Sequence, residues 1–283
     1  MDPVVIIGAP RSGTNMLRDW LADTSRIGTW PCDEINYIWR HGHLSYPSDA
    51  FTVEMATPAV RRYIRRQFQW VEERYATDIV LEKTCANCLR LPFVERVLGG
   101  PKYIFIYRNG VDAVASAMKR WRAELDLPYV LKKARFVPLS DLPYYAVRYA
   151  ASRIYRLLSK DKRVSSWGPV LPNMDSLLDK YDLAEVCALQ WKACVEYSLE
   201  ALETIPRHRV FRLAYEDLVR DKLYYVSEIS GFLGIRSDEL EQSDHFTRMS
   251  TRSVGKGTEQ LSPQTLEAVR NIVQNTTQDL GYQ

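Results

Sequence analysis

The chain alternates short runs of apolar residues with longer segments in which apolar residues recur every three or four positions. The short runs are rich in branched and aromatic side chains, so we expect strands that are buried on both faces of a sheet. These runs lie at residues 4–7, 79–81, 103–107 and 209–213. The longer segments have the period of amphipathic helices. They lie at residues 14–22, 59–75, 89–98, 111–121, 183–202, 224–233 and 263–276.

Strands that alternate with helices predict an α/β fold, in which a P-loop-like parallel sheet is flanked by helices on both faces. Such sheets bind their ligands at the carboxyl ends of the strands. The region from about 122 to 182 breaks the alternation, because it holds several prolines, many tyrosines and the basic string 160–163. We interpret the region 122–182 as a helical and loop insert, or lid, within a single domain that spans residues 1–283.

Composition limits the classes of partner. Of the 283 residues, 46% are hydrophobic and 26% are charged, so we expect a sizeable core rather than global disorder. A formal net charge of +3 favours an anionic ligand but is too small to indicate nucleic-acid binding. The N-terminus lacks the pattern of a secretory signal, and no run approaches about 18 apolar residues, so no membrane span is predicted. We therefore expect a cytoplasmic protein, and the oligomeric state stays open.

Two local features have ordinary structural explanations. The arginines at positions 61, 62, 65 and 66 have helical spacing, and we interpret them as a solvated helix face. The five cysteines are odd in number and scattered, which argues against a disulfide framework. Cys85 and Cys88 form a single CxxC pair, and zinc would need a second pair or suitably spaced histidines. We interpret this pair as a tight turn that carries two small thiols, and we predict no metal site.

A candidate phosphate loop follows the first predicted strand and opens the first helix, at residues 8–15. Its two glycines have Walker-A spacing, in which backbone N–H groups and the helix N-terminus bind phosphate. The Walker lysine is missing, because Thr14 and Asn15 follow Gly13. Arg11 supplies a fixed positive charge instead, and its planar guanidinium suits a tetrahedral oxyanion without a metal. The loop therefore favours a ligand with fewer phosphates than ATP and no obligatory Mg²⁺.

A second candidate anion site follows the strongest predicted strand, at residues 103–107. Arg108 stands at the carboxyl end of this strand, and Ser116 lies about two turns into the next helix. Together they could bind a second, separate phosphate. Alone, an arginine and a helix serine would be ordinary surface residues, and it is the pairing with the first loop that favours a functional interpretation.

With both motifs in place, the sequence resembles the sulfotransferases that depend on 3′-phosphoadenosine 5′-phosphosulfate (PAPS), over most of its length. The first loop resembles the family's 5′-phosphosulfate loop, and Arg108 with Ser116 matches its 3′-phosphate motif. The loop residues concerned are Pro10, Arg11, Ser12, Gly13, Thr14 and Asn15. Glu82, Lys83 and Thr84 resemble a segment of the bacterial and Golgi-type branch, with Cys85 where proline is common.

Two weaker similarities support the resemblance. Tyr215 begins a Tyr-Glu-Asp-Leu segment, and in the family this tyrosine lies near the adenine. Residues 252–257 resemble a C-terminal loop that returns to the 3′-phosphate. The nucleotide-binding candidates in that tail are Ser253, Gly255, Lys256 and Gly257.

The resemblance also implies roles in catalysis. The cytosolic branch uses a histidine base, but Cys85 stands at that position here, so we expect another base. Glu34 occupies the place of the glutamate that follows the first helix in branches that act on carbohydrate or protein tyrosine, with Asp33 as the fallback. A structural role for Glu34 in its loop is the other interpretation. Lys83 and Arg11 would stabilise the transferring sulfonate and the leaving oxygen.

The predicted reaction is in-line, metal-independent transfer of a sulfuryl group from PAPS to an acceptor hydroxyl or amine, which leaves 3′-phosphoadenosine 5′-phosphate (PAP). The acceptor stays open among small molecules, carbohydrates and lipids. A P-loop small-molecule kinase is one alternative, which the missing loop lysine disfavours. A non-catalytic nucleotide-binding protein on the same fold is the other, and the retained Arg11, Lys83, Arg108 and Ser116 argue against it.

Overall fold

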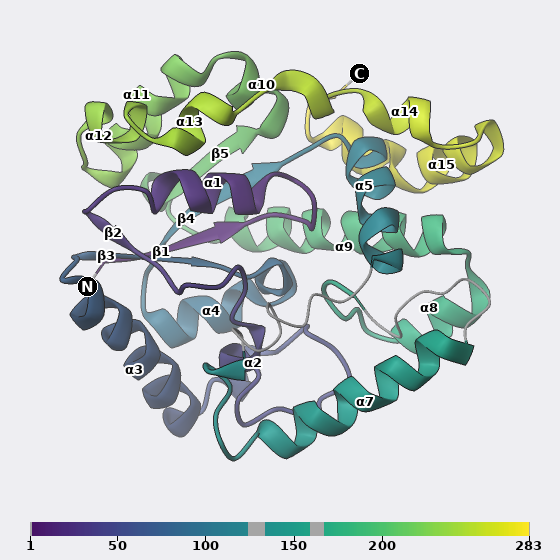
Figure 1. The fold of residues 1–283 in the computed structure, drawn as a ribbon, viewed down its shortest axis with the longest axis horizontal. Helices are drawn as coiled ribbons and strands as arrows, with labels where there is room; N and C mark the ends of the chain where they lie inside the picture. The colour runs from purple at the N-terminus through teal and green to yellow at the C-terminus, as the bar shows by residue number, and fades with distance from the viewer. Residues whose placement is uncertain (1, 124–133, 159–166, 283) are drawn as a thin grey trace.

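The computed structural model describes residues 2–123, 134–158 and 167–282. Five parallel strands form one sheet in the order β2-β3-β1-β4-β5 (Figure 1). The strands are β1 (Asp2–Ile7), β2 (Ile27–Gly28), β3 (Ile79–Lys83), β4 (Lys102–Tyr107) and β5 (Val210–Ala214). Only β2 was not predicted, because two residues are too few to form a periodic pattern.

The longer helices lie where the periodicity predicts them. They are α1 (Thr14–Leu21), α3 (Pro58–Tyr75), α4 (Leu91–Leu98), α5 (Gly110–Arg122), α9 (Leu183–Glu203), α11 (Lys222–Leu233) and α15 (Pro263–Asp279). The predicted helix at 89–98 begins as α4 only at Leu91, since the preceding residues form the 3-10 segment η2 (Cys85–Arg90).

Shorter elements join these helices, and the period of the sequence did not predict them. They are α2 (Asn36–Trp39), η1 (Val53–Met55), α8 (Met174–Lys180), η3 (Arg207–Arg209), α10 (Tyr215–Arg220), α12 (Ser237–Glu241), α13 (Asp244–Arg248), η4 (Thr251–Ser253) and α14 (Lys256–Gln260). A segment of one or two turns shows too few residues to establish a helical repeat.

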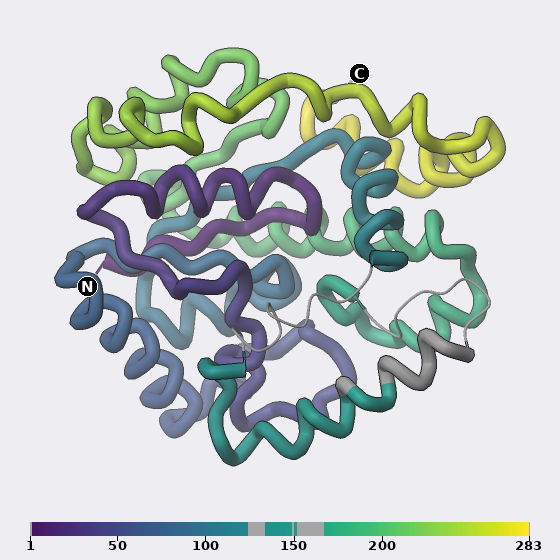
Figure 2. Tube along the Cα trace, viewed as in Figure 1, coloured from purple at the N-terminus to yellow at the C-terminus, as the bar shows by residue number. Residues whose placement is uncertain are grey.

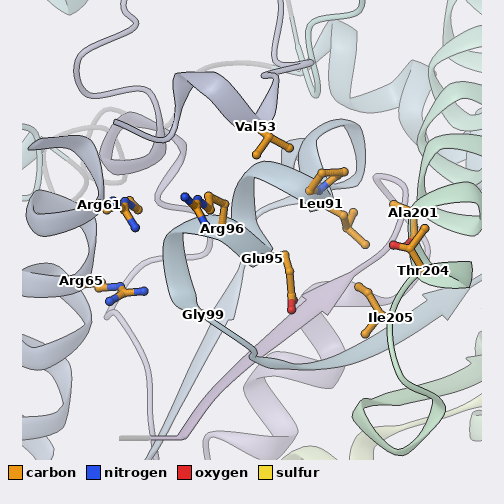
Figure 3. Close-up of a pocket in the computed structure, with 11 residues that line it drawn as sticks. Val53, Arg61, Arg65, Leu91, Glu95, Arg96, Gly99, Ala201, Thr204 and Ile205 are labelled. Atoms are coloured by element: carbon orange, nitrogen blue, oxygen red, sulfur yellow. The ribbon is translucent and has the colours of Figure 1, made fainter. Parts of the chain in front are cut away.

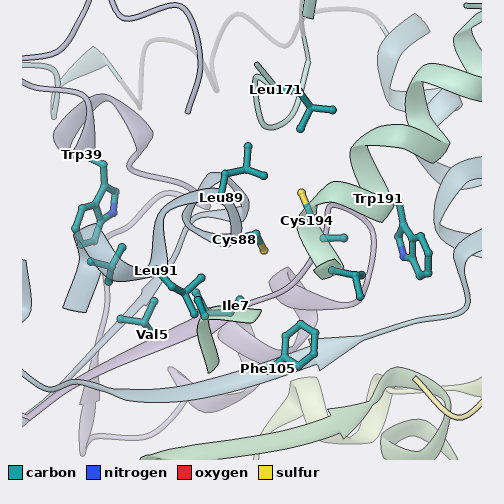
Figure 4. Close-up of a cluster of buried hydrophobic side chains, with 14 of the residues drawn as sticks. Val5, Ile7, Trp39, Cys88, Leu89, Leu91, Phe105, Leu171, Trp191 and Cys194 are labelled. Atoms are coloured by element: carbon teal, nitrogen blue, oxygen red, sulfur yellow. The ribbon is translucent and has the colours of Figure 1, made fainter. Parts of the chain in front are cut away.

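Each face of the sheet is covered by its own apolar core. Successive residues of β1 point to opposite faces, so Val4 and Ile6 join one core while Val5 and Ile7 join the other. Helices α1, α10 and α11 cover the first face, and α3, α4, α5, α9 and α15 cover the second. Figure 4 shows part of the second core, between the sheet and η2, α4 and α9. The predicted α/β fold class is thereby confirmed.

The described part of the region 122–182 contains α7 (Leu142–Leu158) and α8, and α7 runs along the outside of the molecule (Figure 2). The basic string 160–163 lies outside the described residues.

Residues 167–171, which we call the returning segment, form hydrogen bonds with Asp49 on one side and with Gln190 on the other. Asp49 exchanges two 2.8 Å hydrogen bonds with the backbone of Val170, and Gln190 Nε2 donates to the carbonyls of Trp167 and Pro169. A Cβ on Gly168 would lie 3.5 Å from Pro10 Cγ, so this segment lies beside the candidate phosphate loop.

No helix in the part of the chain that the structure describes combines the length and the apolar character needed to cross a bilayer.

Candidate functional site

The predicted motifs meet at one edge of the sheet, which we call the carboxyl edge because the strands end there. The phosphate loop follows β1, Lys83 ends β3, Arg108 follows β4 and Tyr215 follows β5. Since β1 lies between β3 and β4, the chain leaves β1 towards one side of the sheet and leaves β4 towards the other. Such a reversal leaves a crevice at the carboxyl ends of the two strands, where ligands of open α/β sheets bind.

The phosphate loop has the backbone of an anion site. Arg11 and Gly13 both have left-handed backbone conformations, with φ of 72° and 90°. No side chain caps the start of α1 at Gly13, which leaves the first N–H groups of the helix available to a ligand. A Cβ at Gly13 would lie 2.5 Å from the ring of Tyr215, so only glycine fits against this ring. Ser12 Oγ is buried without a hydrogen-bond partner among the described residues.

Arg108 joins three segments that are far apart in the sequence. Its guanidinium donates to the carbonyls of Arg11 and Ser253, and it lies 4.6 Å from the ring centroid of Tyr215. Arg11 Nε in turn donates to Ser116 Oγ at 2.9 Å. The predicted second anion site is therefore next to the first.

Positive charge accumulates around Arg11. Burial lowers the pKa of Arg11 from its ordinary value, and the charges of Arg120 and Arg108 lower it further, against an opposing effect of Cys85. Cations that disfavour one another in this way favour a bound anion. The side chain of Arg11 points towards Ser116, which agrees with its predicted role in nucleotide binding. Its role at the transferring sulfonate stays a prediction.

Asp112 holds the C-terminal tail over this site, and the sequence did not single it out. Its two carboxylate oxygens accept from the backbone N–H groups of Gly257 at 2.6 Å and Gly255 at 2.7 Å. A Cβ at Gly257 would lie 2.7 Å from the backbone of Val111, so the close approach requires glycine. An aspartate in the first turn of a helix is common for electrostatic reasons alone, so its sequence position carries no specific signal.

The tail residues predicted to bind nucleotide lie close to Arg108. Ser253 Oγ and the Tyr215 hydroxyl are 2.6 Å apart, and the Ser253 carbonyl accepts from Arg108. Gly255 has a left-handed φ of 78°, and Lys256, which starts α14, is exposed.

The predicted base and the predicted lysine form an ion pair. Lys83 Nζ lies 2.9 Å from Glu34 Oε1, with the lysine side chain 1% and the glutamate side chain 30% exposed. Burial lowers the pKa of Lys83, but Glu34, Cys85 and Asp33 together raise it above its ordinary value, so the lysine stays charged. The backbone N–H of Cys85 also donates to Glu34 Oε1, at 3.4 Å. Asp33, the fallback base, is half-buried in the same loop.

Contacts from α1 and from Thr84, the residue after β3, place the loop that carries Glu34. The N–H of Ile35 donates to Thr84 Oγ1 at 3.2 Å, and Arg18 of α1 donates to the carbonyl of Cys32 at 2.7 Å. The hydroxyl of Thr14 lies 3.7 Å from Cys85 Sγ, which connects the phosphate loop to the segment after Lys83. The loop with Glu34, the phosphate loop and the end of β3 are thus one packed unit.

A buried polar network supports the end of β3 from behind. Glu82 accepts from Trp39 Nε1 at 3.1 Å and from Asn87 Nδ2 at 2.8 Å. Burial raises the pKa of Glu82 to about 7, although its hydrogen bonds and the charge of Arg90 oppose the rise. Arg90 reaches Asn87 at 2.8 Å and Asp49 at 3.5 Å, and burial lowers the pKa of Arg90 to about 10. This network continues to Asp49, which binds the returning segment of the insert.

The five cysteines are buried, and the CxxC pair lies in η2, a tight turn as predicted. Burial raises the pKa of Cys85 well above its ordinary value, so this thiol stays protonated and is a poor base. Among residues 2–123, 134–158 and 167–282, no group of three or more histidine, cysteine, aspartate or glutamate side chains could hold a metal ion.

A model of the sulfotransferase family matches residues 3–166 of this chain, more than half of its length. The chain belongs to the sulfotransferase family. The matched part includes the phosphate loop, Glu34, Lys83, Arg108 and Ser116. A search of curated proteins found none that matches.

Solved structures show the same fold. The sulfotransferase domain from the curacin biosynthetic pathway is 15% identical, with a TM-score of 0.57 and coverage of 100% of this chain and 98% of that one. The sulfotransferase domain of the Synechococcus PCC 7002 olefin synthase is 15% identical, with a TM-score of 0.52 and coverage of 96% and 94%. A sulfotransferase of Mycobacterium avium is 14% identical, with a TM-score of 0.51 and coverage of 99% and 77%. At these identities the likeness concerns the fold.

Proposed function

We propose that this sulfotransferase transfers the sulfuryl group of PAPS to an acceptor hydroxyl or amine and releases PAP. The observation that carries the proposal is the Lys83–Glu34 pair, 2.9 Å apart, beside a phosphate loop and a second anion site. A donor with phosphates at both its 3′ and 5′ positions matches two adjacent but separate anion sites. A glutamate near the reacting sulfur matches the need for a base.

In this proposal the phosphate loop, residues 10–15, binds the 5′-phosphosulfate through its backbone N–H groups and the start of α1. Arg108 and Ser116 bind the 3′-phosphate, and the tail residues Ser253, Gly255, Lys256 and Gly257 close over it. Tyr215 lies near the adenine. Asp112 contributes indirectly, because its two hydrogen bonds to the tail hold this cover in place.

The transfer needs positioning and electrostatics rather than a covalent intermediate. The acceptor oxygen or nitrogen forms a bond to sulfur while the bond from sulfur to the 5′-phosphate oxygen breaks. Glu34 takes the proton of the acceptor, and Lys83 neutralises the charge that gathers on the leaving oxygen. When Lys83 turns towards that oxygen, its pairing with Glu34 weakens, which makes the carboxylate a stronger base at the moment it is needed.

The acceptor class stays open among small molecules, carbohydrates and lipids, and the chain is proposed to act as one domain. The acceptor must approach Glu34, the exposed member of the pair. Residues 167–171 lie beside the phosphate loop, where Gly168 approaches Pro10. We expect this segment to contribute to acceptor selection.

A screen of acceptors with sulfur-labelled PAPS tests the proposal. Label should pass to at least one acceptor and PAP should accumulate, and activity should persist in EDTA, because Lys83 and the arginines supply the charge that Mg²⁺ supplies in kinases. Transfer of phosphate from ATP that depends on Mg²⁺ would favour the kinase alternative instead. Tight binding of PAPS without transfer to any acceptor class would favour a non-catalytic binding protein.

A further inference from the structure

A second group of arginines lines a pocket at the opposite edge of the sheet. The pocket has a volume of about 440 Å³ and lies between α3, α4 and the C-terminal end of α9. Two residues of its wall, Gly99 and Ile205, shortly precede β4 and β5, so it lies at the edge where the strands begin, which we call the amino edge. The site around Lys83 is at the carboxyl edge, so this pocket is not part of it.

The walls of the pocket differ in character (Figure 3). Arg61 and Arg65 of α3 and Arg96 of α4 lie towards one side. Apolar side chains lie on the other sides, among them Val53, Leu91 and Ile205. The combination provides positive charge and an apolar surface within one small volume.

The pocket arginines form no ion pair with a carboxylate of the described residues. Glu95 also lines the pocket, but it is paired with Arg209 at 2.8 Å and accepts from the Tyr103 hydroxyl at 3.0 Å. Within the described ranges, no carboxylate forms an ion pair with Arg61 or Arg96. Arg61 Nε is buried and finds no acceptor in the described parts of the chain, which leaves part of this cation desolvated and uncompensated.

The four clustered arginines of α3, at positions 61, 62, 65 and 66, differ in their surroundings. Arg61 is half-buried and lines the pocket together with the exposed Arg65 one turn later, whereas Arg62 and Arg66 are exposed and do not line it. Like charges one turn apart on a helix repel each other. Arg65 has a structural task, since its Nε donates to the carbonyl of Val97 near the end of α4. Among the described residues, neither Arg61 nor Arg96 has such a partner, and the solvated-face interpretation does not account for the half-buried Arg61.

We propose that this pocket binds a small organic anion: a carboxylate or sulfate-ester headgroup on a short apolar chain. The headgroup accepts hydrogen bonds from Arg61 and Arg96, and the chain lies against Leu91 and Ile205. The volume of about 440 Å³ is within the usual range of about 300–1,000 Å³ for small-molecule pockets. This inference does not depend on the proposed sulfuryl transfer.

Calorimetric titration of the full chain with octanoate and with octyl sulfate tests the pocket. Both should bind at one site, and the tighter of the two identifies the headgroup. Arg61→Gln and Arg96→Gln should each weaken binding by about tenfold, as expected for the loss of a charged hydrogen bond. Arg62→Gln and Arg66→Gln, from the same helix, are the matched controls and should bind normally. PAP should not displace either probe.

Several results would overturn the proposal. These are no binding of either probe, equal weakening by the control variants, equal binding of octanol, or equal binding of inorganic sulfate and octyl sulfate. A measurement on the unmutated protein covers the case in which a variant fails to fold. Octanoate should protect Arg96, but not Arg62 or Arg66, from an arginine-selective dicarbonyl reagent, as measured by peptide mass spectrometry. Unprotected Arg96 would count against the pocket.

Discussion

Arginines gather at both edges of the sheet, but their surroundings differ. At the carboxyl edge, Arg108 is held by the backbone of Arg11 and Ser253 and by the ring of Tyr215. At the amino edge, Arg61 and Arg96 line a pocket, and neither forms an ion pair with a carboxylate of the described residues. At the carboxyl edge the guanidinium of Arg108 is therefore held in one position before a ligand binds. The amino edge provides positive charge and apolar surface, but the described residues do not hold Arg61 and Arg96 in this way. Precise positioning of this kind is what group transfer requires, and this supports our proposal that the transfer takes place at the carboxyl edge.

The largest expected effect belongs to Glu34. Glu34→Gln keeps the shape of the side chain but cannot accept the acceptor's proton, so turnover should fall by roughly 10²–10⁴-fold while PAP binding is nearly unchanged. Initial rates with the best acceptor and a PAP titration measure both quantities. Asp33→Asn is the matched control and should stay active. If turnover is lost in Asp33→Asn but normal in Glu34→Gln, the base is Asp33 instead. Normal turnover in both variants would mean that the base is another residue.

Lys83→Ala should have the next largest effect. The change removes positive charge beside the leaving oxygen, so turnover should fall by roughly 10²–10³-fold, with weaker PAPS binding as well. Steady-state rates together with the Kd for PAPS separate the two effects. Arg62→Gln removes a charge near the amino edge and should change neither quantity. Equal losses in both variants would mean that overall charge, rather than the carboxyl edge, governs activity.

Two separate anion sites predict that PAP stabilises the fold much more than adenosine 5′-phosphate does. A ligand at 100 times its Kd adds about 2.7 kcal/mol to the free energy of unfolding, so the melting temperature should rise clearly with PAP. Arg108→Gln and Ser116→Ala should remove most of the difference between the two nucleotides. Equal melting shifts with both nucleotides in the unmutated protein would contradict the assignment of the 3′-phosphate site.

The smallest effect concerns the buried support of the carboxyl edge. Burial raises the pKa of Glu82 from 4.5 to about 7, so between these values the native state holds a proton that the unfolded state has released. The contribution of Glu82 to stability should therefore be greatest below this window and fall as pH rises through it, by at most about 1.4 kcal/mol per pH unit. Urea unfolding at several pH values should show a flatter dependence for Glu82→Gln, and Glu73→Gln on the exposed face of α3 should match the unmutated protein. An unchanged slope in the Glu82 variant would mean that Glu82 is ionised throughout.

The sequence predicted long elements better than short ones. Strands such as β4 and helices such as α9 contain enough residues to display a period, and their bounds agree closely with the prediction. β2 and α2 were missed because two and four residues show no repeat. The loop that carries Glu34 lies between these two short elements. The resemblance to the family pointed to Glu34, but nothing in the local pattern could place it against Lys83.

The strand–helix alternation by itself determined the fold class, and the two motifs predicted where an anion binds. Both are local properties: a period within one segment, or a loop directly after a strand. Only the tertiary structure decided the 2.9 Å approach of Lys83 to Glu34, the two hydrogen bonds that the tail donates to Asp112, and the position of the half-buried Arg61 in a pocket. These contacts join segments that are distant in the chain, and their geometry depends on how helices pack on the sheet. No spacing in the sequence encodes that packing directly.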